Sequence, residues 1–409
     1  MPTLFLPCAN GVEALLQEEV QRITGVAAEA ARGGVWVEGD ERTAMRLNLE
    51  SRLAQRVLWP LHDGRYRDEH DLYDLALRVD WQRWITPEQT LRVDMVAMRS
   101  PLKSLNFAAL RIKDAVCDQL REQTGARPSV DTRHPDLRIT LFVGPEHAML
   151  YADTSGDALF KRGWREDTGE APLKETLAAA MLAAAGWQGR AEDGPLFDPC
   201  CGAGTIVIEA AQIACGIAPG GQRRFAFERQ LPFKPFATAW RELQRAARAR
   251  VRASAVPIFA GDVSFRMTDF ATRNAARAGV AAAIEFKTAD ALQRPPPADA
   301  GTLMLNPPYG ERLAPTGQGS MTAREGFEGG GTSSEFFSAL AALWKRQYAG
   351  WHAWLLSPDP KLPTQMRLKE SRRVPLWNGN IECRLFRFEM VQGAGPGQKL
   401  GRARPRHNS

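Results

Sequence analysis

The sequence has no apolar run long enough to cross a membrane. Its most apolar stretch, residues 177–187, is rich in alanine and is shorter than the roughly 20 residues that a bilayer-spanning helix needs. The N-terminus lacks the basic segment and apolar core of a secretory leader. The six cysteines form no Cys-x-x-Cys pair of the kind used by zinc and redox sites. We therefore expect a cytoplasmic protein with reduced thiols, no metal and no membrane contact.

What the sequence does contain is typical of a globular protein. Apolar residues make up 44% and charged residues 24% of the 409 positions, which is enough apolar material to bury a large core. The length indicates two or three domains. A net charge of +6 favours a polyanionic partner, although the excess is small for a chain of this length.

A glycine-containing stretch, residues 198–205, separates a predicted buried strand from a predicted apolar helix. Gly202 and Gly204 lack Cβ, so they can take positive φ and let a ligand approach the backbone closely. The start of the following helix offers free N–H groups to an anionic group. Tight strand–helix turns use the same spacing without a ligand, so the stretch alone leaves both interpretations open.

A second motif, Asn306-Pro307-Pro308-Tyr309, follows the apolar run 302–305. It therefore falls at the carboxyl end of a predicted strand, which is the edge where open α/β sheets bind ligands. The two prolines remove backbone donors and fix the loop, so that carbonyl groups can point into a site. A Pro-Pro turn that only ends a strand is the alternative.

Together the two motifs resemble those of class I S-adenosylmethionine-dependent methyltransferases that methylate nitrogen. The resemblance implies that Asn306 and the Pro307 carbonyl accept the two N–H bonds of an exocyclic amine. It also implies that Tyr309 stacks on the flipped base. The residues expected to bind S-adenosylmethionine are Asp198, Cys200, Gly202, Gly204, Thr205, Asp262, Asp290 and Asn306.

Two of these acidic residues follow later predicted strands. Asp262 ends the strand at 257–260, where a carboxylate can accept both ribose hydroxyls of the cofactor. Asp290 follows the strand at 283–287, where it can accept a hydrogen bond from the adenine amino group. A surface turn is the alternative for Asp262, and a helix N-cap is the alternative for Asp290.

The front of the chain is predicted to be α+β. Residues 34–38 alternate like a half-buried strand, and Asp40 is placed to cap a helix that runs to about residue 58. Further strands and one long helix are predicted before residue 165. Several short segments here resemble the THUMP domain and its ferredoxin-like neighbour in RNA-modifying enzymes. They are residues 112–115, 127–131, 161–165 and 171–178.

The THUMP resemblance implies that the front half binds RNA. The residues expected to contact RNA are Arg111, Lys113, Arg127, Lys161, Arg162 and Arg165. Ordinary solvated charges are the alternative for the first three residues. A salt-bridged linker between domains is the alternative for the last three.

These patterns predict an α/β fold in which a Rossmann-like class I methyltransferase domain follows α+β ferredoxin-like and THUMP modules. The expected limits are 1–60 for the ferredoxin-like module, 61–165 for the THUMP domain, 166–392 for the methyltransferase domain and 393–409 for a basic, disordered tail.

The resemblance is strongest to the N-terminal half of bifunctional bacterial 23S rRNA methyltransferases that make N2-methylguanosine. It implies methyl transfer to guanine N2 in RNA, with 23S rRNA as the substrate and no obligate protein partner. Those proteins continue into a second methyltransferase, whose activity is not expected here. A tRNA guanine-N2 methyltransferase shares the same motifs. A DNA adenine-N6 methyltransferase would also use Asn-Pro-Pro-Tyr, but the THUMP-like front half argues against it. The intact motif residues argue against a non-catalytic RNA-binding module.

Overall fold

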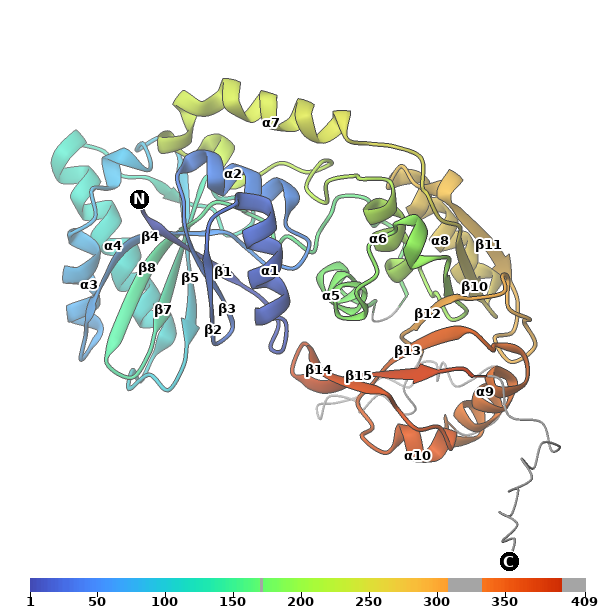
Figure 1. The fold of residues 1–409 in the computed structure, drawn as a ribbon. Helices are drawn as coiled ribbons and strands as arrows, with labels where there is room; N and C mark the ends of the chain where they lie inside the picture. Colours follow the sequence, from blue (N-terminus) through green and yellow to red (C-terminus); the bar gives the residue numbers. More distant parts are fainter. Residues whose placement is uncertain (170–171, 308–332, 392–409) are drawn as a thin grey trace, which may run out of the picture.

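The computed structural model describes residues 1–169, 172–307 and 333–391. Its strands form two sheets, one in each half of the chain (Figure 1). Tyr309 and the basic segment 393–409 lie outside the described residues. No helix within the described ranges is long and apolar enough to cross a bilayer.

The first sheet has eight strands in the order β2-β3-β1-β4-β8-β7-β5-β6. The strands are β1 (Thr3–Pro7), β2 (Ala28–Ala31), β3 (Gly34–Glu38), β4 (Leu58–Arg65), β5 (Thr90–Ala97), β6 (Ser129–Val130), β7 (Leu137–Val143) and β8 (His147–Asp153). The helices are α1 (Glu13–Thr24), α2 (Glu41–Glu50), α3 (Glu69–Leu77), η1 (Trp81–Arg83) and α4 (Leu105–Thr124). Strand β4 pairs with β1 at one point and with β8 along its length, so the sheet runs without interruption through the first half.

Asp40 caps α2 as predicted, because its carboxylate accepts the Thr43 backbone N–H at 2.9 Å. The prediction that this helix reaches residue 58 is wrong, since it ends at Glu50. The buried carboxylate of Glu19, on α1, accepts the Ser51 hydroxyl at 2.7 Å and the Arg52 backbone N–H at 3.0 Å. These bonds hold the chain in a non-helical course between α2 and β4.

The second sheet has seven strands in the order β11-β10-β9-β12-β13-β15-β14. The strands are β9 (Leu196–Asp198), β10 (Ile258–Asp262), β11 (Ile284–Thr288), β12 (Gly301–Leu305), β13 (Trp351–Ser357), β14 (Arg372–Asn378) and β15 (Ile381–Glu389). The helices are α5 (Glu175–Ala185), η2 (Ala191–Asp193), α6 (Thr205–Ala214), η3 (Ala226–Arg229), η4 (Leu231–Phe236), α7 (Ala237–Ala249), α8 (Phe265–Arg277), η5 (Ala281–Ala283), α9 (Ser333–Gln347) and α10 (Leu362–Met366). Strands β9 to β13 are parallel to one another, and β15 is antiparallel to both β13 and β14.

Both faces of the second sheet are buried. Successive side chains of a strand point to opposite faces, so Leu196 packs in the core cluster of α6 while Phe197 packs in the cluster of α9. On β12, Met304 joins the first cluster and Leu305 the second. Burial on both faces explains why these strands are continuous apolar runs in the sequence. The architecture confirms the expected Rossmann-like domain behind an α+β front half.

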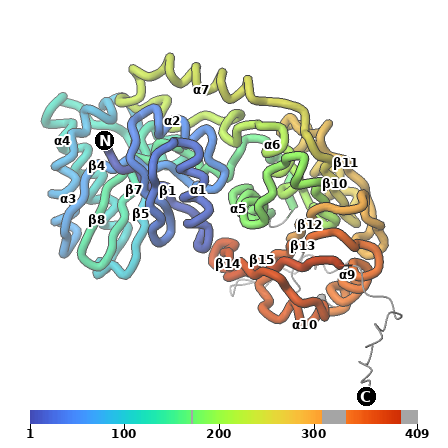
Figure 2. Tube along the Cα trace, viewed as in Figure 1, coloured from blue at the N-terminus to red at the C-terminus, as the bar shows by residue number. Residues whose placement is uncertain are grey.

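Helix α7 links the two halves in space. It lies between β9 and β10 in the chain, yet it packs against α2 of the first half (Figure 2). Its buried residues include Ala239, Trp240 and Ala247, and the Trp240 ring meets that of Phe227 edge to face at 5.0 Å. Helix α7 of the second half therefore packs over the first half, and this contact helps to hold the two halves together.

Candidate active site

Four polar side chains follow four neighbouring strands of the second sheet. Asp262 ends β10, Asp198 ends β9, Asp290 follows β11 and Asn306 follows β12. Because these strands are parallel and adjacent, their carboxyl ends lie at one edge of the sheet. The chain runs outward from β9 to β11 and then returns to the other side of β9 as β12. Such a switch point is where open α/β sheets bind ligands.

The glycine loop lies at this switch point, between β9 and α6. Gly202 has a φ of 52° and Gly204 a φ of 89°, and Gly204 is the N-cap of α6. A Cβ added at Gly204 would lie 3.0 Å from the Ala271 Cβ of α8, whereas one added at Gly202 would meet no atom within 4 Å. Gly204 therefore permits close helix packing. Gly202 borders open space in which a ligand can approach the backbone.

Asp262 ties the end of β10 to the glycine loop. One carboxylate oxygen accepts the Gly202 backbone N–H at 2.9 Å, and the other accepts the Ser264 backbone N–H at 3.0 Å. Each carboxylate oxygen has two lone pairs, so each can accept more than one hydrogen bond. The side chain is half-buried, which keeps it within reach of a ligand at the sheet edge.

Burial disfavours the charged forms of the acid and the thiols next to the loop. Asp198 is 1% exposed, and one of its oxygens accepts the Cys200 backbone N–H at 3.0 Å. Burial raises the pKa of Asp198 well above its usual value, and the charge of Asp262 acts in the same direction. Burial also raises the pKa values of the Cys200 and Cys201 thiols. A protonated thiol is a poor nucleophile, so neither cysteine is suited to covalent catalysis.

The remaining site residues lie at the same edge. Asp290 is half-buried and accepts the Leu292 backbone N–H at 2.9 Å. This bond closes a turn of the kind that a capping residue makes. The other carboxylate oxygen accepts a hydrogen bond from the Gln293 Nε2 at 3.2 Å, and each oxygen has a second lone pair. Asn306 is half-buried directly after β12, and Pro307 is buried.

One residue expected to contact RNA, Arg162, is buried between the halves instead, and this prediction is wrong. The Arg162 side chain is 1% exposed, and its Nε donates to Glu209 on α6 at 3.0 Å. Arg165 donates to Glu175 at 2.7 Å and to the hydroxyl of Thr205 at 2.8 Å. Burial leaves the Arg162 guanidinium inaccessible to phosphate, so it belongs to a salt-bridged linker. The Arg165 side chain is partly exposed and its Nη1 has no hydrogen-bond partner among the described residues, so its contact with RNA stays a prediction.

The sequence analysis did not identify Arg52 and Glu209, which form a buried ion pair between the two halves. Arg52 donates to the second oxygen of Glu209 at 3.1 Å, so this buried carboxylate binds one arginine from the first half and one from the linker. Burial lowers the pKa of Arg52, and the charge of Glu209 opposes that effect. The partners lie 157 positions apart, and no local pattern marks such a pair.

The other residues expected to contact RNA remain predictions. Arg111 lies over the Tyr73 ring at 4.3 Å, and Lys113 pairs with Asp114 at 2.8 Å. Arg127 is exposed, and so is Lys161, which lies 3.3 Å from Asp157. Exposed ion pairs of this kind are weak and can exchange partners, so these side chains stay available to phosphate.

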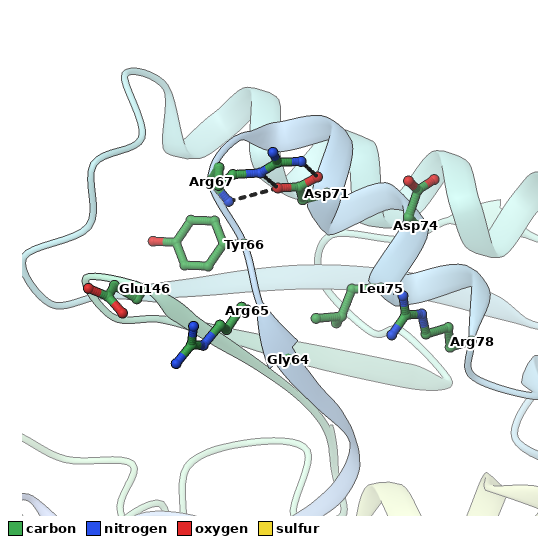
Figure 3. Close-up of a pocket in the computed structure, with 9 residues that line it drawn as sticks. All are labelled: Gly64, Arg65, Tyr66, Arg67, Asp71, Asp74, Leu75, Arg78 and Glu146. Atoms are coloured by element: carbon green, nitrogen blue, oxygen red, sulfur yellow. Dashed lines mark hydrogen bonds and ion pairs between the residues drawn. The ribbon is translucent and has the colours of Figure 1, made fainter.

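A cavity of about 510 Å³ in the first half is a less suitable anion site. Figure 3 shows it between β4 and α3, where it is lined by three arginines and three acidic residues. Arg67 is already paired with Asp71 at 2.9 Å. The balanced charges give no preference for a polyanion. No group of three metal-ligating side chains is present among the residues that the structure describes.

Family models match three consecutive parts of the chain. Residues 162–387 match a model described as "RMKL-like, methyltransferase domain". Residues 66–153 match the THUMP domain, and residues 3–58 match a model described as "RlmL ferredoxin-like domain".

Curated relatives named "Ribosomal RNA large subunit methyltransferase K/L" are similar over almost the whole chain. The protein from Shewanella pealeana is 35% identical over 388 residues, which is 94% of this chain and 52% of that protein. The protein from Alteromonas mediterranea is 36% identical over 95% of this chain and 54% of its own length. The chain therefore spans about half the length of the curated relatives it matches.

Solved structures show the same arrangement of domains. SMU.472, a putative methyltransferase complexed with SAH, has a TM-score of 0.82 and 25% identity, with 96% of this chain and 99% of that chain covered. A possible methylase from Clostridium difficile 630 has a TM-score of 0.82 and 27% identity over the same shares of the two chains.

Proposed function

Because this chain belongs to the RMKL-like methyltransferase family and carries a THUMP domain, we propose that it transfers a methyl group from S-adenosylmethionine to the exocyclic N2 of a guanine in 23S rRNA. The observation that carries the proposal is the sheet edge where the glycine loop and Asn306 follow the adjacent strands β9 and β12. The relatives named as ribosomal RNA methyltransferases support the choice of substrate.

S-adenosylmethionine is the cofactor, and the residues at the sheet edge fit it. The open space at Gly202 and the N-terminus of α6 suit the carboxylate of its methionine part. Asp262 would accept from the ribose hydroxyls, and Asp290 from the adenine amino group. When bound, the cofactor supplies a methyl group on a positively charged sulfur, which is already an activated donor.

Asn306 and Pro307 act on the other reactant. The lone pair of an exocyclic amine is delocalised into its base, so the amine is a poor nucleophile. An amide oxygen from Asn306 and the Pro307 carbonyl can each accept one of its N–H bonds. Two acceptors hold the amine in one orientation, which lowers the entropic part of the barrier. Tyr309 would complete this site by stacking on the base.

The choice of guanine N2 rests on the family rather than on this geometry, because adenine and cytosine amines present the same two donors. The test is incubation of the purified chain with labelled cofactor and either 23S rRNA, total tRNA or duplex DNA, followed by nucleoside analysis. N2-methylguanosine in 23S rRNA supports the proposal. The same product in tRNA supports the alternative of a tRNA guanine-N2 methyltransferase. Methyladenine in DNA would overturn both.

Replacement of Asp262 by alanine should weaken cofactor binding by at least about tenfold, because a hydrogen bond to a charged group contributes about 1.5–3 kcal/mol. The substitution also removes the acceptor of the Gly202 N–H, so the loop itself is loosened. Isothermal titration calorimetry gives the dissociation constant. Asp269→Ala is the matched control, since Asp269 lies on the next helix and pairs with exposed Arg273. Equal affinities for the Asp262 variant and the wild type would remove Asp262 from the site.

A further inference from the structure

A second cavity, of about 420 Å³, lies where the two halves of the chain meet. One wall is the loop before β7, another is the turn after β8, and the third is the segment that contains η3. The cavity is lined by Arg133, His134, Pro135, Arg138, Ser155, Gly156, Asp157, Arg224, Phe225, Ala226, Glu228 and Arg229. We call it the junction cleft.

Cations outnumber acids in the junction cleft. Four of its side chains are arginines, and two are carboxylates. Glu228 accepts the Phe225 backbone N–H at 2.8 Å, and Asp157 forms an exposed ion pair with Lys161 at 3.3 Å. The cleft therefore favours an anion, unlike the balanced cavity of Figure 3.

The walls of the cleft are held rigidly. Arg223 donates to the backbone carbonyls of Ala158 at 2.7 Å and Lys161 at 3.0 Å, and also to those of Ser155 and Asp157. Burial lowers the pKa of Arg223 to about 10, which leaves it charged at neutral pH. Arg223 therefore holds the turn after β8 against the segment that contains η3. A preorganised site loses less entropy when it binds.

Two of the lining arginines are fixed by partners, and two are not. Arg138 donates to Asp94 at 3.0 Å, and Arg229 donates to the Pro135 carbonyl at 3.0 Å. Arg133 and Arg224 are exposed, and neither side chain has a hydrogen bond or ion pair within the described parts of the chain. They come from different halves of the protein and line the same cleft.

We propose that the junction cleft binds a backbone phosphate of the RNA substrate through Arg133 and Arg224. The inference rests on the proposed function and names a contact that the function does not itself require. A guanidinium presents a planar fork of donors that matches phosphate geometry. Both arginines are exposed, so a nucleic acid strand can continue past the cleft in either direction. A phosphate bound here contacts both halves at once and so sets the register of the RNA relative to the sheet edge.

The test is RNA binding by the full chain carrying Arg133→Gln and Arg224→Gln together. Labelled 23S rRNA transcript is titrated at several salt concentrations by filter binding. The affinity should fall several-fold, and the slope of log affinity against log salt should become shallower by about 0.7 to 0.9, because one phosphate contact no longer releases counterions. Cofactor affinity should equal that of the wild type, because both residues lie outside the sheet-edge site.

The matched control carries Arg22→Gln and Arg32→Gln, which remove two exposed charges that do not line the cleft. The control should keep the wild-type slope. A cleft variant with the wild-type slope would overturn the inference, and so would an equal loss in the control. The proposed function is judged separately, on whether the wild type makes N2-methylguanosine in the same RNA. A wild type that does so while the cleft variant binds normally refutes the inference alone, and a wild type that binds no RNA refutes both.

Discussion

Replacement of Asn306 by alanine is expected to lower the rate of methyl transfer by at least about a hundredfold, which is the usual effect of losing one preorganised polar group at a reacting centre. The side chain follows β12 at the sheet edge, beside the strand that carries the glycine loop. The amine of the substrate would lose one of its two acceptors and much of its orientation. The rate is measured in a single turnover with saturating RNA and cofactor.

Two further measurements distinguish a role of Asn306 in methyl transfer from a role in cofactor binding. Cofactor affinity should change little in Asn306→Ala, because Asp262 and the glycine loop are retained. Asn306→Asp keeps the shape and an acceptor oxygen, so it should lose less rate than the alanine variant. A wild-type rate in Asn306→Ala would refute the proposed role of this residue. A loss of cofactor affinity equal to the loss of rate would mean that Asn306 acts in binding instead.

Replacement of Glu209 by alanine is expected to lower the free energy of unfolding by about 3–5 kcal/mol, because it leaves two arginines without their buried partner. The carboxylate is fully buried and contacts both Arg52 and Arg162. It lies on α6, one turn after the glycine loop, and so joins the first half to the cofactor side of the second. Urea unfolding followed by circular dichroism measures the loss.

An exposed ion pair provides the control for Glu209. Glu370 lies 2.6 Å from Arg373, and both side chains are partly exposed. Glu370→Ala should cost no more than about 1 kcal/mol, because water and salt screen a pair at the surface. If the Glu209 and Glu370 variants unfold with similar losses, then the buried contact does not hold the two halves together.

The features that could be predicted from the sequence are those with a local cause. The glycine loop lies between a strand and a helix because an apolar run stands on each side of it, and residues 302–305 form a strand because they are continuously apolar. Asp40 was recognisable as a cap because capping needs only a short side chain just before a helix. Such patterns involve residues a few positions apart.

The features that could not be predicted depend on distant partners. Arg162 has the same sequence context whether it faces RNA or a carboxylate 47 positions away on α6. Strand β14 was not predicted, because among the described strands it is an edge strand that pairs with β15 alone, and it contains Pro375. The end of α2 was misplaced because Glu19, from another helix, binds the chain after it.

The most direct measurement of the central claim is mass spectrometry of nucleosides from 23S rRNA of a strain that lacks this protein. The strain is complemented either with the wild-type chain or with Asn306→Ala. The account predicts that N2-methylguanosine falls in the deletion strain, returns with the wild type and does not return with the variant. An unchanged level of N2-methylguanosine in 23S rRNA after deletion would contradict it.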